Sequence, residues 1–281
     1  MENKTILKGI VKETIAPIKK HPDFESELAD EALFGMVVKI LRHEKDGWYY
    51  IETQYDYQGY IHEKYLHIDK VRAEEWEKNA NSCINHAIID VMAEPKYQSY
   101  GIKLLTRGAI VCTTGVTEGE WSQMLMPDDT KGWTKTRFTN RINKWNEKEQ
   151  EKIIRKKLVE TALLYLGTQY RWGGKTPLGI DCSGLCSMVY LLHGKIIHRD
   201  SKFNEKYLRK ISREEIQAAD ILFFPKHVAL YIGEDKYIHS TSFSGEVVIN
   251  SLNSHHEDYR DDLANTITGF GSVFKAPPLD L

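Results

Sequence analysis

Residues 179–185 read Gly-Ile-Asp-Cys-Ser-Gly-Leu, and this stretch decides the fold of the C-terminal half of the chain. After Cys182, apolar residues recur at helical spacing until Gly194, which predicts a helix that begins at the cysteine. The helix dipole and the unpaired amide groups of the first turn would stabilise a thiolate there and lower the pKa of the thiol. Because a thiolate is the attacking species in acyl transfer, Cys182 is a candidate nucleophile. A buried cysteine that starts a core helix is the alternative interpretation.

Three apolar segments downstream, within residues 220–240, alternate in the manner of β-strands. A hairpin centred on Gly233 would place His227 directly opposite His239, with their Cβ atoms about 5 Å apart. The two imidazoles could then hydrogen-bond, one as the base and the other holding its tautomer. With Cys182 they form a nucleophile, base and orienter set. Two histidines on a solvated strand face are the alternative.

Upstream of the cysteine, apolar spacing predicts a helix over 153–166, closed by Gly167 in the C-terminal cap position. The segment 145–150 connects into this helix, so a domain should begin near residue 148. A second segment, 71–80, is rich in Glu and Lys and is expected to be a short helical connector.

Two stretches within residues 5–143 look alike. In each, an aromatic strand is followed 12 residues later by a Gly-aromatic pair, from Trp48 to Tyr60 and from Trp121 to Trp133. Short strands at this spacing, separated by Gly and Asp turns, predict small all-β barrels. The pattern resembles the bacterial SH3-like domain, and the second copy matches it less well.

Composition limits the possible functions. A length of 281 residues indicates two or three domains. The formal net charge of -2 offers no basic excess for nucleic acid or an anionic membrane. Charges interrupt every apolar run near the N-terminus, so we expect no signal peptide, no membrane span and a cytoplasmic location.

Nothing in the sequence predicts a metal or a cofactor. The four cysteines have no metal-ligand spacing, and reduced thiols are the default in the cytosol. The adjacent His255 and His256 lie in a polar segment without further ligand spacing.

The C-terminal motifs together resemble the NlpC-type family of bacterial cell-wall cysteine peptidases. They are Tyr-Arg-Trp-Gly-Gly (170–174), Asp-Cys-Ser-Gly-Leu (181–185), His-Val-Ala-Leu-Tyr-Ile-Gly (227–233) and Tyr-Ile-His-Ser (237–240). The whole-chain arrangement is similar to that of the γ-D-glutamyl-L-diamino-acid endopeptidases. The resemblance implies an α+β chain: a papain-like cysteine peptidase domain (148–281) preceded by two small SH3-like β-barrels, at 1–70 and, with the connector, at 71–147.

The resemblance also implies roles for single residues. Cys182 would be the nucleophile, His227 the base and His239 the orienter. The Cys182 backbone N–H and Tyr170 would stabilise the oxyanion. The residues expected to line the substrate groove are Tyr170, Trp172, Asp181, Ser183, Asp200 and Ser201.

The expected substrate is a murein-derived peptide with a free N-terminal L-alanine, cut between γ-D-glutamate and the diamino acid during recycling of the cell wall. A free ammonium needs a carboxylate nearby, and Asp181 is one candidate. Glu27 and Tyr57 of the first barrel are further candidates, with ordinary surface residues as the alternative.

Two other functions stay open at this point. A thiol acyltransferase or amidase would use the same Cys182, His227 and His239 set on another amide. A non-catalytic cell-wall-binding protein would rely on the SH3-like regions alone. The sequence leaves open the oligomeric state and the choice between diaminopimelate and lysine at the cleaved bond.

Overall fold

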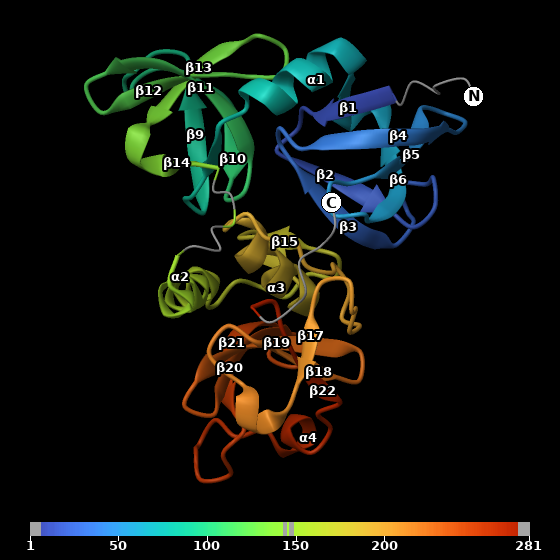
Figure 1. Ribbon diagram of the computed structural model, residues 1–281. Coiled ribbons are helices and arrows are strands. Elements are labelled where there is room, and N and C mark those ends of the chain that lie inside the picture. The colour runs from blue at the N-terminus through green and yellow to red at the C-terminus, as the bar shows by residue number, and fades with distance from the viewer. Residues whose placement is uncertain (1–6, 143–144, 146–148, 275–281) are drawn as a thin grey trace. The chain divides into compact units, whose positions relative to one another are not determined.

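The computed structural model describes residues 7–142, 145 and 149–274. The chain divides into two compact units, Met1–Ile142 and Asn143–Leu281 (Figure 1). The first unit consists almost entirely of strands, and the second combines an antiparallel sheet with helices. In the described part of the chain, no helix is both long enough and apolar enough to span a bilayer.

Two seven-stranded antiparallel sheets form the first unit, and their strands follow the same order. The first sheet runs β3-β2-β6-β5-β4-β1-β7, and the second runs β10-β9-β13-β12-β11-β8-β14. The elements of the first are β1 (Leu7–Val11), β2 (Ile15–Lys19), β3 (Leu28–Leu33), β4 (Val37–His43), β5 (Trp48–Glu52), β6 (Gln58–His62), η1 (Glu63–Tyr65) and β7 (Leu66–Ile68). Those of the second are β8 (Ser82–Ile84), β9 (Ile88–Met92), β10 (Gly101–Thr106), β11 (Ile110–Glu118), β12 (Trp121–Leu125), β13 (Lys131–Lys135), η2 (Thr136–Phe138) and β14 (Thr139–Arg141).

A close approach of two strands recurs at the same place in both sheets. A Cβ atom on Gly59 would meet a side-chain methyl of Ile18 at 2.4 Å, and one on Gly132 would meet a methyl of Val91 at 2.4 Å. Only glycine leaves room for the neighbouring strand at these positions. The Gly-aromatic pairs of the sequence therefore mark where a branched side chain packs against bare backbone.

Phe34 links the two sheets into one unit. Its side chain is 1% exposed and packs among buried residues of the second sheet, including Ile84, Leu105 and Val111. Its carbonyl oxygen accepts the N–H of Ile110 at 2.8 Å. The two sheets thus share part of one core.

The helix α1 (Lys70–Asn79) connects the two sheets, as the charged segment 71–80 predicts. Asp69 caps its N-terminus by accepting the N–H of Arg72 at 3.0 Å. Trp76 is 2% exposed and donates its indole N–H to the carbonyl of Gly35 at 2.8 Å. The helix is therefore anchored by burial as well as by a buried hydrogen bond.

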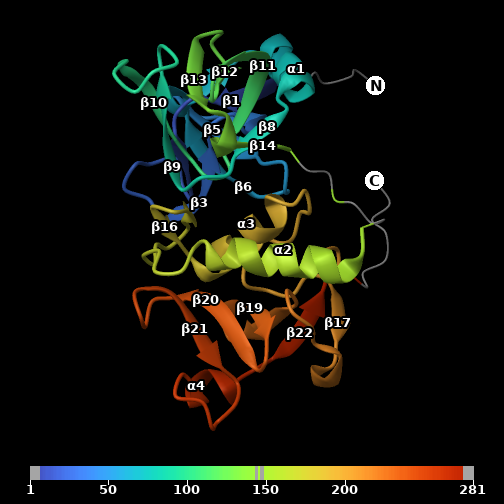
Figure 2. The ribbon, with the colours of Figure 1, turned by 90° about the vertical axis from the view of Figure 1, so that its left-hand side faces the viewer.

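The second unit is built on a six-stranded sheet in the order β17-β22-β18-β19-β20-β21. Helices α2 and α3 lie on one side of it and α4 on the other (Figure 2). The elements are α2 (Glu151–Leu163), β15 (Lys175–Thr176), β16 (Gly179–Ile180), α3 (Cys182–Leu191), β17 (Arg209–Ile211), η3 (Arg213–Glu215), β18 (Ile221–Phe224), β19 (His227–Gly233), β20 (Lys236–Thr241), β21 (Glu246–Ser251), α4 (Asp261–Ala264) and β22 (Gly269–Ser272).

The predicted helix that begins at Cys182 and the predicted strands at 220–240 are confirmed. Two other predictions need correction. First, α2 ends at Leu163, and tight turns rather than helix lead to Gly167. Second, the prediction that His227 pairs directly with His239 is wrong. Leu230 lies opposite Ile238, so this register places Ala229 opposite His239, and the two histidines are diagonal neighbours on one face.

We expect Phe34→Ala to destabilise the first unit by about 3–5 kcal/mol, because it leaves a cavity in the shared core. Hydrogen exchange in increasing urea should show lower opening free energies in β8, β9 and β11 as well as in the first sheet. Phe24→Ala, at a side chain that is 47% exposed, is the matched control and should cost much less. If the opening free energy decreased only in the first sheet, the result would contradict a shared core.

Candidate active site

The first turn of α3 is fixed by its N-cap residue. The Asp181 carboxylate accepts the backbone N–H of Gly184 at 2.6 Å, which is the ordinary capping contact of an aspartate. A Cβ atom on Gly184 would meet the carbonyl oxygen of Gly174 at 2.2 Å, so only glycine fits here. The Asp-Cys-Ser-Gly sequence thus seats the start of the helix against the Gly173-Gly174 loop and places Cys182 in the first turn.

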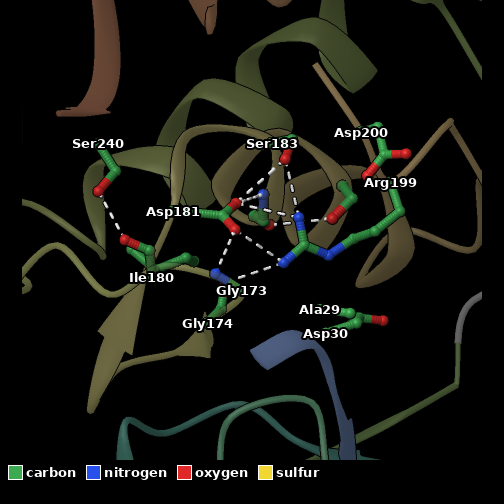
Figure 3. A network of polar contacts seen from close by, with 12 residues as sticks. Ala29, Asp30, Gly173, Gly174, Ile180, Asp181, Ser183, Arg199, Asp200 and Ser240 are labelled. Carbon is green, nitrogen blue, oxygen red and sulfur yellow. Dashed lines mark hydrogen bonds and ion pairs between the residues drawn. The ribbon is translucent and has the colours of Figure 1, made fainter. Parts of the chain in front are cut away.

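A buried ion pair holds this arrangement (Figure 3). Arg199 is 2% exposed, and two of its guanidinium nitrogens each lie 3.0 Å from a carboxylate oxygen of Asp181. The same carboxylate accepts the Gly173 N–H at 2.9 Å and the Ser183 hydroxyl at 3.1 Å. Arg199 also donates to the Ser183 hydroxyl oxygen at 2.8 Å. Paired and hydrogen-bonded in this way, the buried charges satisfy one another.

The environment of Cys182 corrects one expectation. The side chain is 8% exposed, and burial raises the pKa of the Cys182 thiol to about 11, with a further rise from the Asp181 charge. The backbone N–H groups of Val228 and Ser183 act in the opposite direction but do not prevail. The prediction that the helix N-terminus lowers the pKa of this thiol is therefore wrong for the resting protein, because desolvation outweighs the dipole. The contact with Val228 nevertheless places the sulfur beside the residue that follows His227.

Three side chains form a hydrogen-bonded chain across β19, β20 and β21. His227 Nε2 lies 2.7 Å from His239 Nδ1, and His239 Nε2 lies 2.8 Å from the Asn250 side-chain oxygen. The Asn250 amide nitrogen in turn donates to the backbone carbonyl of Asp258 at 2.9 Å. The predicted contact between the two imidazoles is thus present despite the diagonal register, since imidazoles span the gap that smaller side chains would leave.

Burial lowers the pKa of both imidazoles. Desolvation, followed by electrostatic repulsion from His239 and Arg260, lowers the pKa of His227 to about 3. The pKa of His239 falls to about 4, again chiefly through desolvation, although its contact with Asn250 acts the other way. Burial therefore favours the uncharged forms of the Cys182 thiol and of both imidazoles near neutral pH.

The remaining sequence candidates of the second unit differ in their exposure and environment. Desolvation and the nearby Cys182 and Asp181 raise the pKa of Tyr170 to about 12, which keeps its hydroxyl protonated. Trp172 is 61% exposed. Asp200 is exposed and lies 3.9 Å from a ring nitrogen of His198, and Ser201 is half-buried.

A pocket adjoins the cysteine on the side of Ser183 and Val228. It is lined by Ser183, Cys186, Ile197, His198, Asp200, Lys202, Leu208, Ile221, Phe223 and Val228. Its lining combines apolar side chains with four titratable ones, Cys186, His198, Asp200 and Lys202, and Ser183 directly follows Cys182 in the chain.

Glu27 and Tyr57 belong to the first unit. Glu27 forms an exposed ion pair with Lys20 at 3.1 Å, and the Tyr57 hydroxyl donates to the carbonyl of Ala29 at 3.2 Å. Both residues lie at the ends of strands, Glu27 before β3 and Tyr57 before β6. Their predicted part in substrate binding stays a prediction.

Two residues of the network were not singled out from the sequence. Arg199 directly precedes Asp200 and Ser201, which the resemblance places at the groove, and its burial against Asp181 has no local sequence signal. Asn250 is one asparagine within an alternating strand, and only the pairing of β20 with β21, which puts Asn250 opposite Tyr237, brings it to His239. In the part of the chain that the structure describes, no group of three or more His, Cys, Asp or Glu residues could hold a metal ion.

Arg199→Met should destabilise the start of α3 by about 3–5 kcal/mol, because it leaves the Asp181 carboxylate buried without its partner charge. The measurement is the opening free energy of the Gly184 and Leu185 amides by hydrogen exchange. Arg213→Met, at an exposed arginine of η3, is the control and should change it by less than about 0.5 kcal/mol. Equal effects of the two substitutions would refute a structural role for the pair.

Acid should destabilise the second unit through His227 and His239. In the unfolded chain they bind protons near the ordinary pKa of 6.5, but in the folded chain only near about 3 and 4. The unfolded state therefore holds more protons between these values, and stability falls as pH drops from 6.5 toward 4, by at most about 1.4 kcal/mol per pH unit for each histidine. The free energy of unfolding, measured by urea denaturation at several pH values, should depend less steeply on pH in His227→Gln than in the wild type. In His21→Gln it should depend on pH as steeply as in the wild type. An unchanged slope in His227→Gln would contradict the neutral site.

Comparison with known protein families divides the chain along similar lines. Residues 167–264 match the NlpC/P60 family. Residues 18–66 match the bacterial dipeptidyl-peptidase SH3 domain. The first match contains the Asp181–Arg199 network and the Cys182, His227 and His239 centre, and the second lies within the first sheet.

Individual relatives extend the likeness to the whole chain. Dipeptidyl-peptidase 6 of Lysinibacillus sphaericus is 39% identical over 273 residues, which cover 95% of this chain and 100% of that protein. The γ-D-glutamyl-L-lysine dipeptidyl-peptidase of Bacillus cereus is 25% identical over 82% of this chain and 72% of its own length. A crystal structure of an NlpC/P60 family protein from Bacillus cereus shares the fold, with a TM-score of 0.78, 19% identity and coverage of 96% of this chain and 100% of that one. With this family match and relatives of this kind, the chain belongs to the NlpC/P60 family and is a cysteine-type peptidase.

Proposed function

We propose that this peptidase hydrolyses the bond between γ-D-glutamate and the diamino acid in murein peptides that carry a free N-terminal L-alanine. Two relatives are named as dipeptidyl-peptidases, and one of these names specifies a γ-D-glutamyl-L-lysine bond. The single observation that supports catalysis in this chain is the 2.7 Å contact between His227 and His239, next to the Val228 N–H that meets the Cys182 sulfur.

In the proposed reaction, His227 takes the proton of the Cys182 thiol as the sulfur attacks the γ-carbonyl carbon. Because burial keeps both groups neutral at rest, proton transfer and attack are coupled. The C–N bond then breaks, His227 returns the proton to the leaving amine, and a thioester remains. Water, deprotonated by His227, attacks that thioester, the C–S bond breaks, and His227 returns the proton to the Cys182 sulfur as the dipeptide is released.

The developing oxyanion would accept hydrogen bonds from the Cys182 backbone N–H and the Tyr170 hydroxyl. A pKa of about 12 suits Tyr170 to this role, because the hydroxyl stays protonated and can donate throughout the reaction. Such donors contribute only if they are already in place when negative charge develops on the carbonyl oxygen.

Substrate recognition would use the rim of the site. Trp172 and Asp200 are exposed and Ser201 is half-buried, so a peptide could contact them. Ser183 directly follows the proposed nucleophile in the chain. Asp181 is a candidate for the free ammonium, but a bound ammonium would share its carboxylate with Arg199. We propose Glu27 and Tyr57 as the further determinants of the amino end.

We also propose the three-part organisation of the sequence, with SH3-like barrels at 1–70 and 71–147 and a papain-like domain at 148–281. The identical strand order of the two N-terminal sheets supports the first two parts. A role in recycling wall peptides in the cytoplasm follows from the preference for short peptides with a free amine.

The test is incubation with L-Ala-γ-D-Glu-meso-diaminopimelate and with L-Ala-γ-D-Glu-L-Lys, followed by mass spectrometry for L-Ala-D-Glu. We expect the dipeptide from at least one of them. N-acetylation should lower kcat/KM by about 10- to 100-fold, the value of a charge-assisted hydrogen bond. Equal cleavage of free and acetylated peptides would remove Asp181, Glu27 and Tyr57 from amine recognition.

Cys182→Ala should abolish turnover without unfolding the protein. Cys112→Ala is the matched control, since Cys112 is a half-buried free cysteine of the first unit, and it should retain full activity. Substantial turnover by Cys182→Ala would overturn the nucleophile assignment.

A further inference from the structure

The backbone carbonyl of Asp258 orients the side-chain amide of Asn250. Its oxygen accepts the backbone N–H of Ser251 at 3.0 Å and the Asn250 side-chain NH2 at 2.9 Å. A carbonyl oxygen can only accept hydrogen bonds, so the NH2 group of Asn250 must point toward it. The amide oxygen therefore points the other way, and it lies 2.8 Å from His239 Nε2.

This orientation determines which nitrogen of His239 carries the proton. An amide oxygen is an acceptor only, so His239 Nε2 must be the donor. A neutral imidazole has one N–H, and its Nδ1 is then a bare acceptor. His227 Nε2, at 2.7 Å from that Nδ1, must in turn donate its own proton.

The result is a defined lone pair on His227. With its proton on Nε2, neutral His227 has an unprotonated Nδ1, the ring nitrogen nearer to its own main chain. The Cys182 sulfur contacts the main-chain N–H of the next residue, Val228. The sulfur therefore lies beside the main chain that carries His227, and Nδ1 is the ring nitrogen nearer to that main chain.

We infer that Asn250 is a positioning residue: the Asp258 carbonyl orients its amide, and that amide sets the tautomers of both histidines. Nδ1 of His227 is thereby left free to take the proton of Cys182. The role of His227 as base in this inference rests on the proposed function. The hydrogen-bonding pattern fixes the protons on the two Nε2 atoms, and the lowered pKa of His227 leaves its Nδ1 unprotonated. Asn250 never contacts the reacting atoms in this arrangement and acts only through His239.

The charged and titratable groups around the histidines do not alter the donor pattern. Arg260, which precedes α4, acts electrostatically on both rings, and Asp262 on α4 opposes it at His239. These two side chains pair with each other, with nitrogen–oxygen distances of 2.7 and 2.6 Å. The ring of Tyr237 lies 5.0 Å from that of His239, centroid to centroid, in an edge-to-face arrangement.

The direct test is long-range ¹H–¹⁵N correlation NMR of the full chain labelled with ¹⁵N-histidine, at pH 7 and without substrate. His227→Gln and His239→Gln spectra assign the two rings. We expect both to be neutral with the proton on Nε2. A proton on Nδ1 of either ring, or an imidazolium form at pH 7, would overturn the inference without any reference to activity.

Two substitutions test the role of Asn250 in turnover. Asn250→Ala removes the acceptor, should mix the tautomers of His239, and should lower kcat/KM about 100-fold with little change in KM, since positioned general-base catalysis contributes about 10²–10⁴-fold. Asn250→Asp keeps an acceptor of the same shape, so the tautomers and most of the activity should persist. The acid limb of its kcat/KM profile should move to higher pH, because a carboxylate favours the imidazolium.

The matched control is Asn253→Ala. Asn253 caps a neighbouring turn by accepting the N–H of His255 at 3.0 Å, and its substitution should leave the tautomers and kcat/KM unchanged. Wild-type tautomers and turnover in Asn250→Ala would refute the positioning role. If the wild-type chain shows the expected tautomers but cleaves no murein peptide, the proposed function fails and the tautomer assignment stands.

Discussion

The site depends on one buried carboxylate. Asp181 caps α3, holds the Gly173 amide and pairs with Arg199, so a single side chain joins the helix, the preceding loop and a distant segment. Its charge is acceptable inside the protein only because the guanidinium and several N–H or O–H donors surround it. The position of the neighbouring sulfur follows from this network, since Cys182 is the next residue.

Burial favours the uncharged forms of the Cys182 thiol and of the two histidines, although the neighbouring Asp181 and Arg199 are a charged pair. The carboxylate that fixes Cys182 also disfavours a thiolate, and desolvation opposes charge on the thiol and on both histidines. A neutral thiol is a weak nucleophile, so in the proposed mechanism the proton passes to His227 as the sulfur attacks. The ordering of the imidazole protons then matters more than a preformed ion pair would.

The sequence motifs predicted the class of enzyme more accurately than they predicted the geometry of the site. Residue types and spacing around Cys182, His227 and His239 were enough to predict a helix start, three strands and a histidine pair. The actual hairpin register is shifted, because the turn falls at Glu234 and Asp235, and sequence alternation does not fix a turn to one residue. The thiol pKa was misjudged for a related reason: the helix dipole is visible in sequence, but burial depends on what packs around the sulfur. Arg199 and Asn250 act through tertiary contacts that no local pattern encodes.

The packing of the Phe34 side chain against the second sheet limits where the chain can be cut into separately folding parts. A cut at residue 70 would follow an obvious linker in the sequence, yet it would strip an aromatic ring of the partners that cover it. The first sheet is therefore not a free-standing module that could be grafted onto another enzyme. The transferable piece is the pair of sheets together with α1.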